Sequence, residues 1–392
     1  MNAESKDALA SEFAEAMRTA LEEALAGMGR VNVAIFGRTG VGKSTLINAF
    51  FGDKVARTGI GKPVTEKIDY YEHPNGMLGI YDSQGFETGQ SGDALLKGMR
   101  VLVEERRNSA LSEQIHVVWY CVQASDRRFE DSQAEFVRAL AALGLPVLAV
   151  MTQVEHDRHD VTHPESVEFA QYIQSLDLPL SPNNHVIHTN AMEDRHARNP
   201  TPVHGLDDLL DATIEVVPEA VQRALIAVQG HDKKRKIEAS RQVVVGASVA
   251  AGAAATVPIP LADSAMIVPI QVLMMARVAT FWDMPVGPRT LTGLATSAFF
   301  GQGTAFVGKA AVRSLLRLIP GANIAVGVIS AGVAATLTLA VGEAWIAVCL
   351  RLNGKDQSAI IAAIDSPELR SIFIEAFKQQ VRHPRNRKPL EK

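Results

Sequence analysis

Nine residues, Gly37 to Thr45, bring three glycines, one lysine and three hydroxyl side chains together in the stretch GRTGVGKST. Glycines let backbone amides turn inward around closely spaced phosphate oxygens, and the N-terminus of a following helix adds a favourable dipole. The stretch fits the pattern G-x-x-x-x-G-K-[ST] and lies between an apolar segment, 31–36, and a helical pattern that starts at Ser44. The spacing therefore predicts a loop that binds the phosphates of a nucleoside triphosphate, and not a glycine-rich turn with a chance lysine.

Each residue type in this loop has an expected role. Lys43 is expected to reach the β- and γ-phosphates and to stabilise the charge that develops during transfer, and Ser44 is expected to ligate Mg²⁺. The backbone amides around them are expected to hold the phosphate oxygens. The predicted nucleotide contacts of the loop are Arg38, Thr39, Gly40, Val41, Gly42, Lys43, Ser44 and Thr45.

A second acidic motif follows at a suitable distance. Asp82-Ser83-Gln84-Gly85 ends an apolar segment 39 residues after Lys43; the aspartate can hold Mg²⁺ through a water, and the Gly85 amide can contact a γ-phosphate. Thr65, predicted in a loop just before a strand, is expected to complete the Mg²⁺ shell, and Thr58 is the alternative. The predicted metal ligands are thus Ser44, Thr65 and Asp82, and the predicted catalytic residues are Lys43 and Thr65.

Short apolar or alternating segments separated by helical patterns must position these motifs. Helical patterns cover 93–113 and 130–143, and residues 4–29 form an acidic amphipathic helix expected to dock on the protein itself. This alternation predicts an α/β fold with a doubly wound, mostly parallel sheet and one antiparallel pair at 67–82. The predicted strands are 31–36, 67–72, 77–82, 115–122, 145–151 and 185–189.

The two halves of the chain carry opposite charge. Residues 1–229 hold 20 Lys and Arg against 33 Asp and Glu, a formal charge of −13, and residues 230–392 hold 19 against 10, or +9. The acidic half argues against nucleic acid as a partner, and the basic half suggests an anionic membrane surface. Cys121 and Cys349 lie in apolar runs, as expected for buried thiols in a reducing compartment, and the acidic first thirty residues do not predict a secretory signal.

Long uncharged runs, 242–262 and 318–342, dominate the second half. Either run is long enough to cross a bilayer. Pro258 and Pro260 interrupt the first and Pro320 opens the second, so the pattern predicts helical hairpins and no β-structure. Two alternatives remain open: hairpins that associate with a membrane, and a soluble bundle packed through small residues. The expected helices are 235–256, 263–281, 290–317 and 322–352.

The motifs within 30–215 resemble the translation-factor-class small GTPases, the Era-like group. The resemblance implies a base-recognition motif N/T-K-x-D, here Thr152-Gln153-Val154-Glu155, and an S-A-K-like motif, here Thr189-Asn190-Ala191. It implies that the stem of Gln153 covers the purine, that the Glu155 carboxylate accepts from guanine, and that a backbone amide meets guanine O6. Because Gln153 and Glu155 depart from the family pattern, ATP remains an alternative to GTP. The implied base contacts are Thr152, Gln153, Glu155, Asn190 and Ala191.

Two further departures concern catalysis. Phe86 stands where Ras-type members of the family carry the glutamine that orients water, and Gly40 stands where potassium-assisted relatives carry asparagine. Intrinsic hydrolysis is therefore expected to be slow, with a partner, a self-dimer or an internal arginine such as Arg127 or Arg128 supplying what is missing. The histidine-rich stretch EHDRHDVTH, which contains His156, His159 and His163, is expected to be a solvated loop more readily than a metal site.

The second half resembles an alanine-rich, YcjF-type helical domain of unknown function that accompanies bacterial GTPases. The matching stretches are VPIPLADSAMIVPIQVLMMARVA and LIPGANIAVGVISAGVAATLTLAVGEAW. The resemblance implies bacterial origin and contact with the inner membrane, and the basic tail is expected to touch lipid headgroups. The expected domains are an N-terminal helix (1–29), a GTPase domain (30–225), a helical domain (226–380) and a basic tail (381–392).

Together these patterns predict a GTP-binding protein on the cytoplasmic side of the membrane. It is expected to hydrolyse GTP slowly with Mg²⁺, and its GTP or GDP state is expected to control the attached helical domain. A nucleotide-gated scaffold without hydrolysis, and a dynamin-like or immunity-related-type membrane-remodelling GTPase, are the alternatives.

Overall fold

The computed structural model describes residues 15–16, 18–52, 62–65, 68–73, 75–83, 90–156, 161–193, 201–255, 259–260, 268–282, 328–355, 357–364 and 366–382. The chain divides into two compact units. The sheet unit is Met28–Asp232, and the helical unit comprises Met1–Gly27 and Lys233–Lys392. The N-terminal helical segment, described at residues 15–16 and 18–26, therefore groups with the C-terminal helices.

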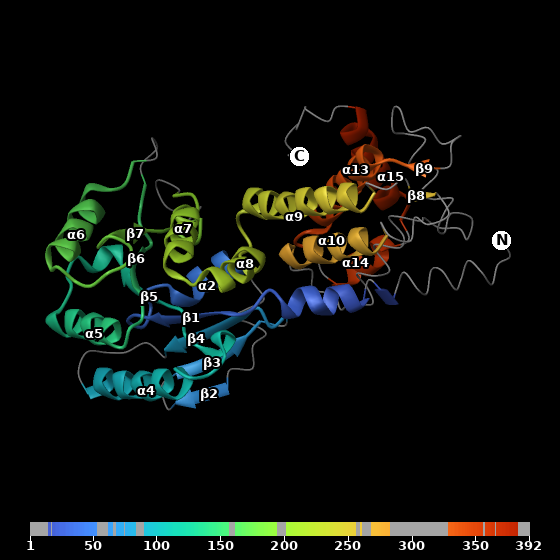
Figure 1. Cartoon of the computed structure of the whole chain (residues 1–392). Coiled ribbons are helices and arrows are strands. Elements are labelled where there is room, and N and C mark those ends of the chain that lie inside the picture. Colours follow the sequence, from blue (N-terminus) through green and yellow to red (C-terminus); the bar gives the residue numbers. More distant parts are fainter. Residues whose placement is uncertain are drawn as a thin grey trace. The chain divides into compact units, whose positions relative to one another are not determined.

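The sheet unit contains a mixed sheet whose described strands follow the order β2-β3-β4-β1-β5-β6-β7 (Figure 1). Strands β4, β1, β5, β6 and β7 run parallel, while β3 is antiparallel to both β2 and β4. The predicted doubly wound, mostly parallel sheet is thus confirmed, as is the antiparallel pair predicted at 67–82, and the pairing of β2 with β3 adds a second antiparallel pair. The strands are β1 (Val31–Phe36), β2 (Lys62–Thr65), β3 (Ile68–Glu72), β4 (Leu78–Ser83), β5 (Val117–Gln123), β6 (Val147–Thr152) and β7 (Val186–His188).

Strand β2 corrects the sequence prediction. Thr65 was expected in a loop, but it ends this edge strand and is paired with Ile68. The four residues of β2 include Pro63, which disfavours an interior strand position, and their pairing depends on the neighbouring β3 more than on any local pattern. An edge strand tolerates such a residue because one of its sides makes no ladder.

Helices connect the strands of the sheet unit. The helix predicted at 93–113 ends at Arg106, because Asn108 and Ser109 favour a turn, and the one-turn helix η1 (Leu111–Glu113) follows. A second such turn, η2 (Ala124–Asp126), follows β5. The helices are α2 (Lys43–Phe51), α4 (Gln90–Arg106), α5 (Asp131–Ala142), α6 (Pro164–Ser175), α7 (Leu206–Val216) and α8 (Glu219–Val228).

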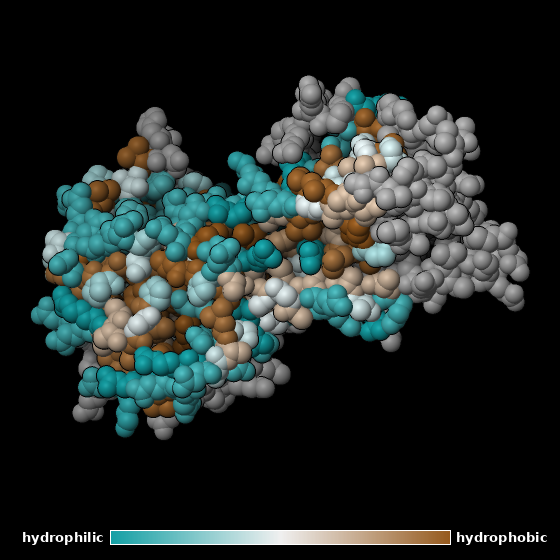
Figure 2. All heavy atoms as spheres, in the orientation of Figure 1, coloured by the Kyte–Doolittle hydropathy of each residue, from teal (hydrophilic) through white to brown (hydrophobic). Residues whose placement is uncertain are grey.

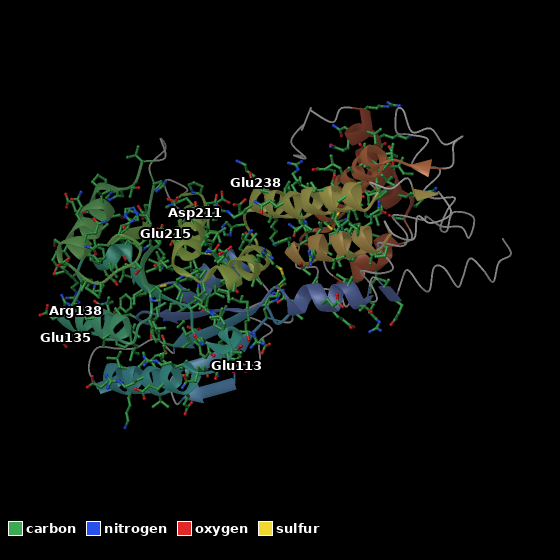
Figure 3. All side chains as sticks on the ribbon, viewed as in Figure 1. Glu113, Glu135, Arg138, Asp211, Glu215 and Glu238 are labelled. Atoms are coloured by element: carbon green, nitrogen blue, oxygen red, sulfur yellow. The ribbon has the colours of Figure 1, made fainter. Side chains whose placement is uncertain are left out.

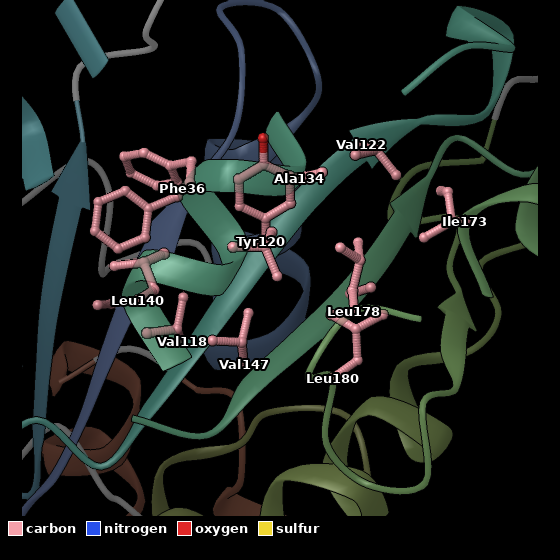
Figure 4. Close-up of a cluster of buried hydrophobic side chains, with 14 of the residues drawn as sticks. Phe36, Val118, Tyr120, Val122, Ala134, Leu140, Val147, Ile173, Leu178 and Leu180 are labelled. Carbon is pink, nitrogen blue, oxygen red and sulfur yellow. The ribbon is translucent and has the colours of Figure 1, made fainter. Parts of the chain in front are cut away.

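Apolar side chains cover both faces of the central strands. On one face Val118, Tyr120 and Val122 of β5 join a buried cluster with Phe36 and Phe136 (Figure 4). On the other face the Trp119 ring stacks on Phe51 and meets Phe50 edge to face, at centroid distances of 5.7 and 4.8 Å. Burial on both faces explains why these strands are continuous apolar runs and do not alternate.

The faces of helices α5 and α7 that point away from the sheet are charged. Glu135 and Arg138 on α5, and Asp211 and Glu215 on α7, point away from the sheet (Figure 3). Each helix therefore places its apolar stripe on the sheet and its charged stripe in solvent.

The helical unit is built from α9 (Lys233–Ala254), α10 (Val268–Phe281), α13 (Ala331–Leu352), α14 (Gln357–Ile364) and α15 (Pro367–Arg382). Helix α13 packs against α9, α10 and α15 (Figure 1). The sequence predicted no β-structure here, and this was wrong: β8 (Ile259–Pro260) pairs with β9 (Val328–Ile329) as a short antiparallel ladder. The predicted helix at 290–317 lies outside the described residues.

Helices α9 and α13 run antiparallel in close contact. Arg241 pairs with Glu343 at 3.0 Å, and Ser248 Oγ donates to the carbonyl oxygen of Ala335 at 3.0 Å. Between these contacts Gly342 faces Val244 so closely that a Cβ would lie 2.4 Å from its Cγ1. Small residues thus bring the two helices together, as the sequence suggested for either a bundle or a membrane hairpin.

Helix α13 is long and apolar enough to cross a bilayer, and 61% of its most apolar 18-residue window is buried within the protein. Trp345 is fully buried, and its Nε1–H donates to the carbonyl oxygen of Met275 in α10 at 2.9 Å. Much of the apolar surface of α13 is therefore covered by neighbouring helices.

Candidate functional site

The glycines of the loop between β1 and α2 have backbone conformations that only glycine adopts easily. Gly37 has a φ of +145°, and a Cβ there would lie 2.4 Å from the carbonyl oxygen of Cys121. Gly40 has a φ of +85°, and Gly42, with a φ of +96°, forms the N-cap of α2. The loop can therefore curl against β5 and present backbone amides ahead of a helix N-terminus.

Lys43 lies inside this loop. Its side chain is buried, and the ammonium donates to the carbonyl oxygens of Gly37 at 2.9 Å and Arg38 at 3.1 Å. Burial lowers the pKa of Lys43, while the nearby Asp82 and Cys121 oppose that shift. The cation is thus held at the centre of the curve where phosphate oxygens would gather.

Asp82 is the last residue but one of β4, where it pairs with Ile35 of β1 and approaches the same loop. Burial raises its pKa to about 6, against the effect of Lys43 and with a smaller contribution from Asp69. Its buried Oδ1 has no hydrogen-bond partner among the described residues. A buried carboxylate oxygen with spare acceptor capacity suits a hard divalent cation, so the residues here fit Mg²⁺.

The other predicted metal and phosphate residues are only partly described. Ser44 is exposed in the first turn of α2, where its hydroxyl is accessible. The side chain of Thr65 lies outside the described part of the structure, although its backbone ends β2. Thr58, Gly85 and Phe86 also lie outside the described residues.

Thr152 joins the predicted base-recognition loop to the phosphate loop. It ends β6, and its hydroxyl lies 2.5 Å from the carbonyl oxygen of Val41 and 3.1 Å from that of Val122. The hydroxyl can donate only one hydrogen, which these two carbonyls share. Thr152 therefore fixes the phosphate loop against the ends of two parallel strands.

Gln153 has a left-handed backbone, with a φ of +55°, and an exposed side chain. Gln123 Nε2 donates to Gln153 Oε1 at 3.1 Å, and a Cβ on Gly42 would lie 3.4 Å from Gln153 Nε2. The Gln153 amide thus lies beside the phosphate loop, held by Gln123. No sequence pattern pointed to Gln123, because its place beside Gln153 depends on the pairing of β5 with β6.

Glu155 and Asn190 occupy neighbouring loops beyond β6 and β7. Glu155 is exposed, while Asn190 is buried. The Asn190 side-chain amide donates to carbonyl oxygens within its own loop, and its backbone N–H donates to His204 at 3.1 Å. Of the two amides predicted to meet the base, that of Asn190 is therefore already used, and Ala191 is the remaining candidate.

Several other sequence candidates have structural roles. Arg127 is exposed and forms an ion pair with Glu165, and Arg128 is also exposed. His156 stacks on His204, and His159 lies outside the described residues. Across the described ranges, no group of three or more His, Cys, Asp and Glu side chains is arranged to hold a metal ion.

Comparisons with known proteins match both units. Residues 32–153 match the family model described as 50S ribosome-binding GTPase, and residues 223–378 match the model described as a domain of unknown function, DUF697. A stretch of 94 residues is 34% identical to the small ribosomal subunit biogenesis GTPase RsgA of Methanosarcina acetivorans, covering 21% of this chain and 25% of the relative. The chain thus spans about a quarter of that relative's length.

Solved structures with similar segments include GTP-binding proteins. A probable GTP-binding protein EngB matches at 22% identity with a TM-score of 0.32, over 47% of this chain and 98% of that chain. Era of Aquifex aeolicus, bound to GDP and AlF4⁻, matches at 18% identity with a TM-score of 0.31, over 56% of this chain and 68% of that chain. The chain therefore contains an N-terminal segment that matches a GTPase family model and a C-terminal segment that matches the DUF697 model.

Proposed function

We propose that this protein binds GTP and GDP with Mg²⁺ and hydrolyses GTP to GDP and phosphate. The observation that carries the proposal is the position of Lys43, buried within a glycine-built loop and near Asp82, whose buried Oδ1 has no partner in the described ranges. A cation at the start of α2 and a carboxylate near the end of β4 suit a triphosphate bound together with a divalent metal.

Different residues of the chain would bind the phosphates, stabilise the transition state and hold the metal ion. The amides between Gly37 and Ser44 would hold phosphate oxygens, and Lys43 would turn from the carbonyls of its loop to the β- and γ-phosphates and stabilise charge in the transition state. Ser44, Thr65 and Asp82 would hold Mg²⁺, which supplies Lewis-acid stabilisation of the phosphates. The proposed slow rate rests on Phe86, because its side chain cannot orient water.

Equilibrium binding of fluorescent GTP and GDP to two lysine variants tests the site. Lys43→Ala should abolish binding, because the cation inside the loop is lost. Lys97→Ala, which removes an exposed lysine of α4, is the matched control and should bind as the wild type does. GTP binding of normal affinity in Lys43→Ala would refute the site. Competition by ATP at equal concentration separates a guanine site from an adenine site.

We further propose that the nucleotide state controls the helical unit through the chain segment Gln229–Asp232, which joins the two units. Within the sheet unit this segment is bonded to the end of α2, since Gly230 N donates to the carbonyl oxygen of Phe50 at 2.8 Å. The Oε1 atom of Gln229, a fully buried residue, accepts a hydrogen bond from the backbone N–H of Asp232 at 2.8 Å. These contacts hold the segment that precedes α9 in the chain against the end of the phosphate-binding helix α2.

An anionic membrane surface on the cytoplasmic side is the partner that we propose for the helical unit. Helix α9 carries the exposed Lys233 and Lys234 at its start, and none of its residues after Arg241 is charged. In this uncharged part the side chains of Val245 and Val249 are 44% and 68% exposed. Figure 2 shows hydrophobic surface over α9. Because α9 and α13 are antiparallel, their uncharged ends lie together, and this polarity favours an interface between water and lipid.

Flotation of the full chain with vesicles of phosphatidylcholine and phosphatidylglycerol tests this partner. Val249→Glu should reduce flotation because it places a charge on the exposed apolar face of α9. Ile361→Glu makes the same kind of change at a 49% exposed residue of α14 and should leave flotation intact. Wild-type protein that stays with the soluble fraction in both GDP and a GTP analogue would contradict the membrane proposal.

A further inference from the structure

Three loop segments meet beside the proposed base-binding residues. The first segment follows β6 and contains Val154, the second follows β7 and contains Thr189, and the third precedes α7 and contains His204. Val154 N in the first donates to Thr189 O in the second at 3.1 Å. In the third, His204 pairs with Asn190 through both backbone groups, with N–O distances of 3.1 and 3.0 Å. His204 therefore fixes the path of the loop that contains Ala191.

The side chain of His204 reaches the other base-recognition loop. Its Nε2 lies 2.9 Å from the carbonyl oxygen of Val154, so this nitrogen carries the hydrogen and donates it. Its ring stacks on His156, with centroids 3.6 Å apart and planes inclined by 19°. His156 Nε2 in turn lies 3.2 Å from Thr162 Oγ1. The imidazole of His204 thus contacts Val154 and His156, the two neighbours of Glu155, while the His204 backbone is bonded to Asn190 in the loop after β7.

The backbone next to His204 leaves it little freedom. Gly205 has a φ of +74°, and a Cβ there would lie 1.8 Å from the carbonyl oxygen of His188. Only glycine permits this close approach to β7. The backbone before α7 is therefore held in one position, and so is the Cα atom from which the His204 side chain extends.

We propose that His204 is a positioning residue for base recognition. It sets the spacing between Glu155, on one loop, and the amide of Ala191, on the other, without touching the nucleotide itself. This inference rests on the proposed GTP-binding function. Glu155 is exposed and lies between two residues that His204 contacts, Val154 and His156, so loss of the imidazole would free the carboxylate to move.

A positioning role predicts a loss of discrimination between bases. The phosphate loop is fixed separately, through Thr152 and Lys43, so both GTP and ATP should keep their phosphate contacts when His204 is changed. Only GTP should lose affinity, because the Glu155 carboxylate would no longer be held in place to accept hydrogen bonds from guanine. A residue that served only stability would lower the melting temperature and leave the ratio of the two affinities unchanged.

The experiment measures dissociation constants for GTP and ATP in wild type, His204→Ala, His204→Gln and His185→Ala, all in the full chain. His204→Ala should weaken GTP binding about tenfold, as expected for loss of one part-buried hydrogen bond, and should reduce the GTP/ATP preference by a similar factor. His204→Gln retains a side-chain N–H donor for Val154 and should recover most of the preference. His185→Ala, at an exposed histidine just before β7, is the matched control and should bind as the wild type does.

The outcomes separate this inference from the proposed function. Wild-type protein that binds neither nucleotide overturns the proposed function, and the inference falls with it. Wild-type protein that prefers GTP, together with an equal preference in folded His204→Ala, overturns only the role of His204. If His204→Ala does not fold, His204→Phe decides, because it keeps a ring that can stack on His156 and lacks the donor to Val154. A GTP/ATP preference far below that of wild type in folded His204→Phe supports positioning, and an unchanged preference overturns it.

Discussion

The backbone N–H of Gly230 donates to the carbonyl oxygen of Phe50 at 2.8 Å, so the last turn of α2 is bonded to the segment that leads into the helical unit. His231 strengthens this connection. Its ring centroid lies 4.9 Å from that of Phe50, and its Nε2 lies 3.2 Å from the carboxylate of Asp207. Because α2 begins at Lys43, a single short helix links the phosphate loop to the exit of the sheet unit.

Replacing His231 should weaken this link. In wild type, we expect hydrogen exchange of the first turn of α9 to differ between GDP and a GTP analogue. His231→Ala should reduce that difference while nucleotide affinity stays within about twofold, because the ring contacts Phe50, at the far end of α2 from Lys43, and Asp207 of α7. His185→Ala is the control. An undiminished difference in His231→Ala would exclude this residue from the coupling.

Removing the hydroxyl of Thr152 should weaken all nucleotides alike. Thr152→Val keeps the shape of the side chain but loses the contact with Val41, at a cost of about 1 kcal/mol or roughly fivefold in affinity. The GTP/ATP preference should not change, in contrast to the His204 variants. Thr336→Val, which removes a hydroxyl from α13 in the helical unit, is the control. A selective loss of GTP binding would show that Thr152 acts on the base instead.

Asp82 should determine the dependence of binding on Mg²⁺. For wild type we expect GTP affinity to fall sharply when EDTA removes the metal. Asp82→Asn keeps the size of the side chain but removes its charge, so its affinity should be almost the same with and without Mg²⁺. Asp93→Asn, at an exposed residue of α4, should retain the wild-type dependence. Strong Mg²⁺ dependence in Asp82→Asn would place the metal ligand elsewhere.

Acid should weaken the sheet unit through His116. Its Nδ1 accepts from Asn32 N and its Nε2 lies against Leu111 O, both at 2.9 Å, so the folded state holds the neutral ring. Burial lowers its pKa below the ordinary value of 6.5. The unfolded chain therefore binds the proton first, and stability should fall as the pH drops below about 6.5, down to the lowered folded-state pKa.

Thermal unfolding between about pH 7.5 and 5.5 measures this effect. His116→Gln should show a shallower decline of melting temperature than wild type across that range. The decline should not vanish, because burial also lowers the pKa of His188 and His231. A slope identical to that of wild type would mean that His116 does not contribute.

Close packing of α9 on α13 should make Gly342 and Val244 interdependent. Gly342→Ala should destabilise the helical unit by about 1–3 kcal/mol, because the new methyl group overlaps the side chain of Val244. Val244→Ala makes room, so the double variant should lose less than the sum of the two single variants. Hydrogen exchange of the amides of α13 provides the measurement. Strict additivity would show that the helices separate freely at this point.

The sequence by itself determined the phosphate loop and most of the sheet. The order of glycines, Lys43 and Ser44 is a local pattern, and its chemistry depends on neighbouring residues in the chain. Buried strands such as β1 and β5 are continuous apolar runs, so their presence and parallel arrangement followed from local composition. The division into an acidic first half and an alanine-rich second half was equally readable.

Tertiary structure decided the contacts between distant segments. The strand containing Thr65 exists because β3 offers it a partner, and the β8–β9 ladder joins segments almost seventy residues apart. Gln123 and His204 carry no sequence signal, since their roles depend on which strand ends and loops lie beside Gln153 and Val154. Local propensity shapes single elements, whereas pairing across the chain depends on how those elements pack, and only the folded structure contains that information.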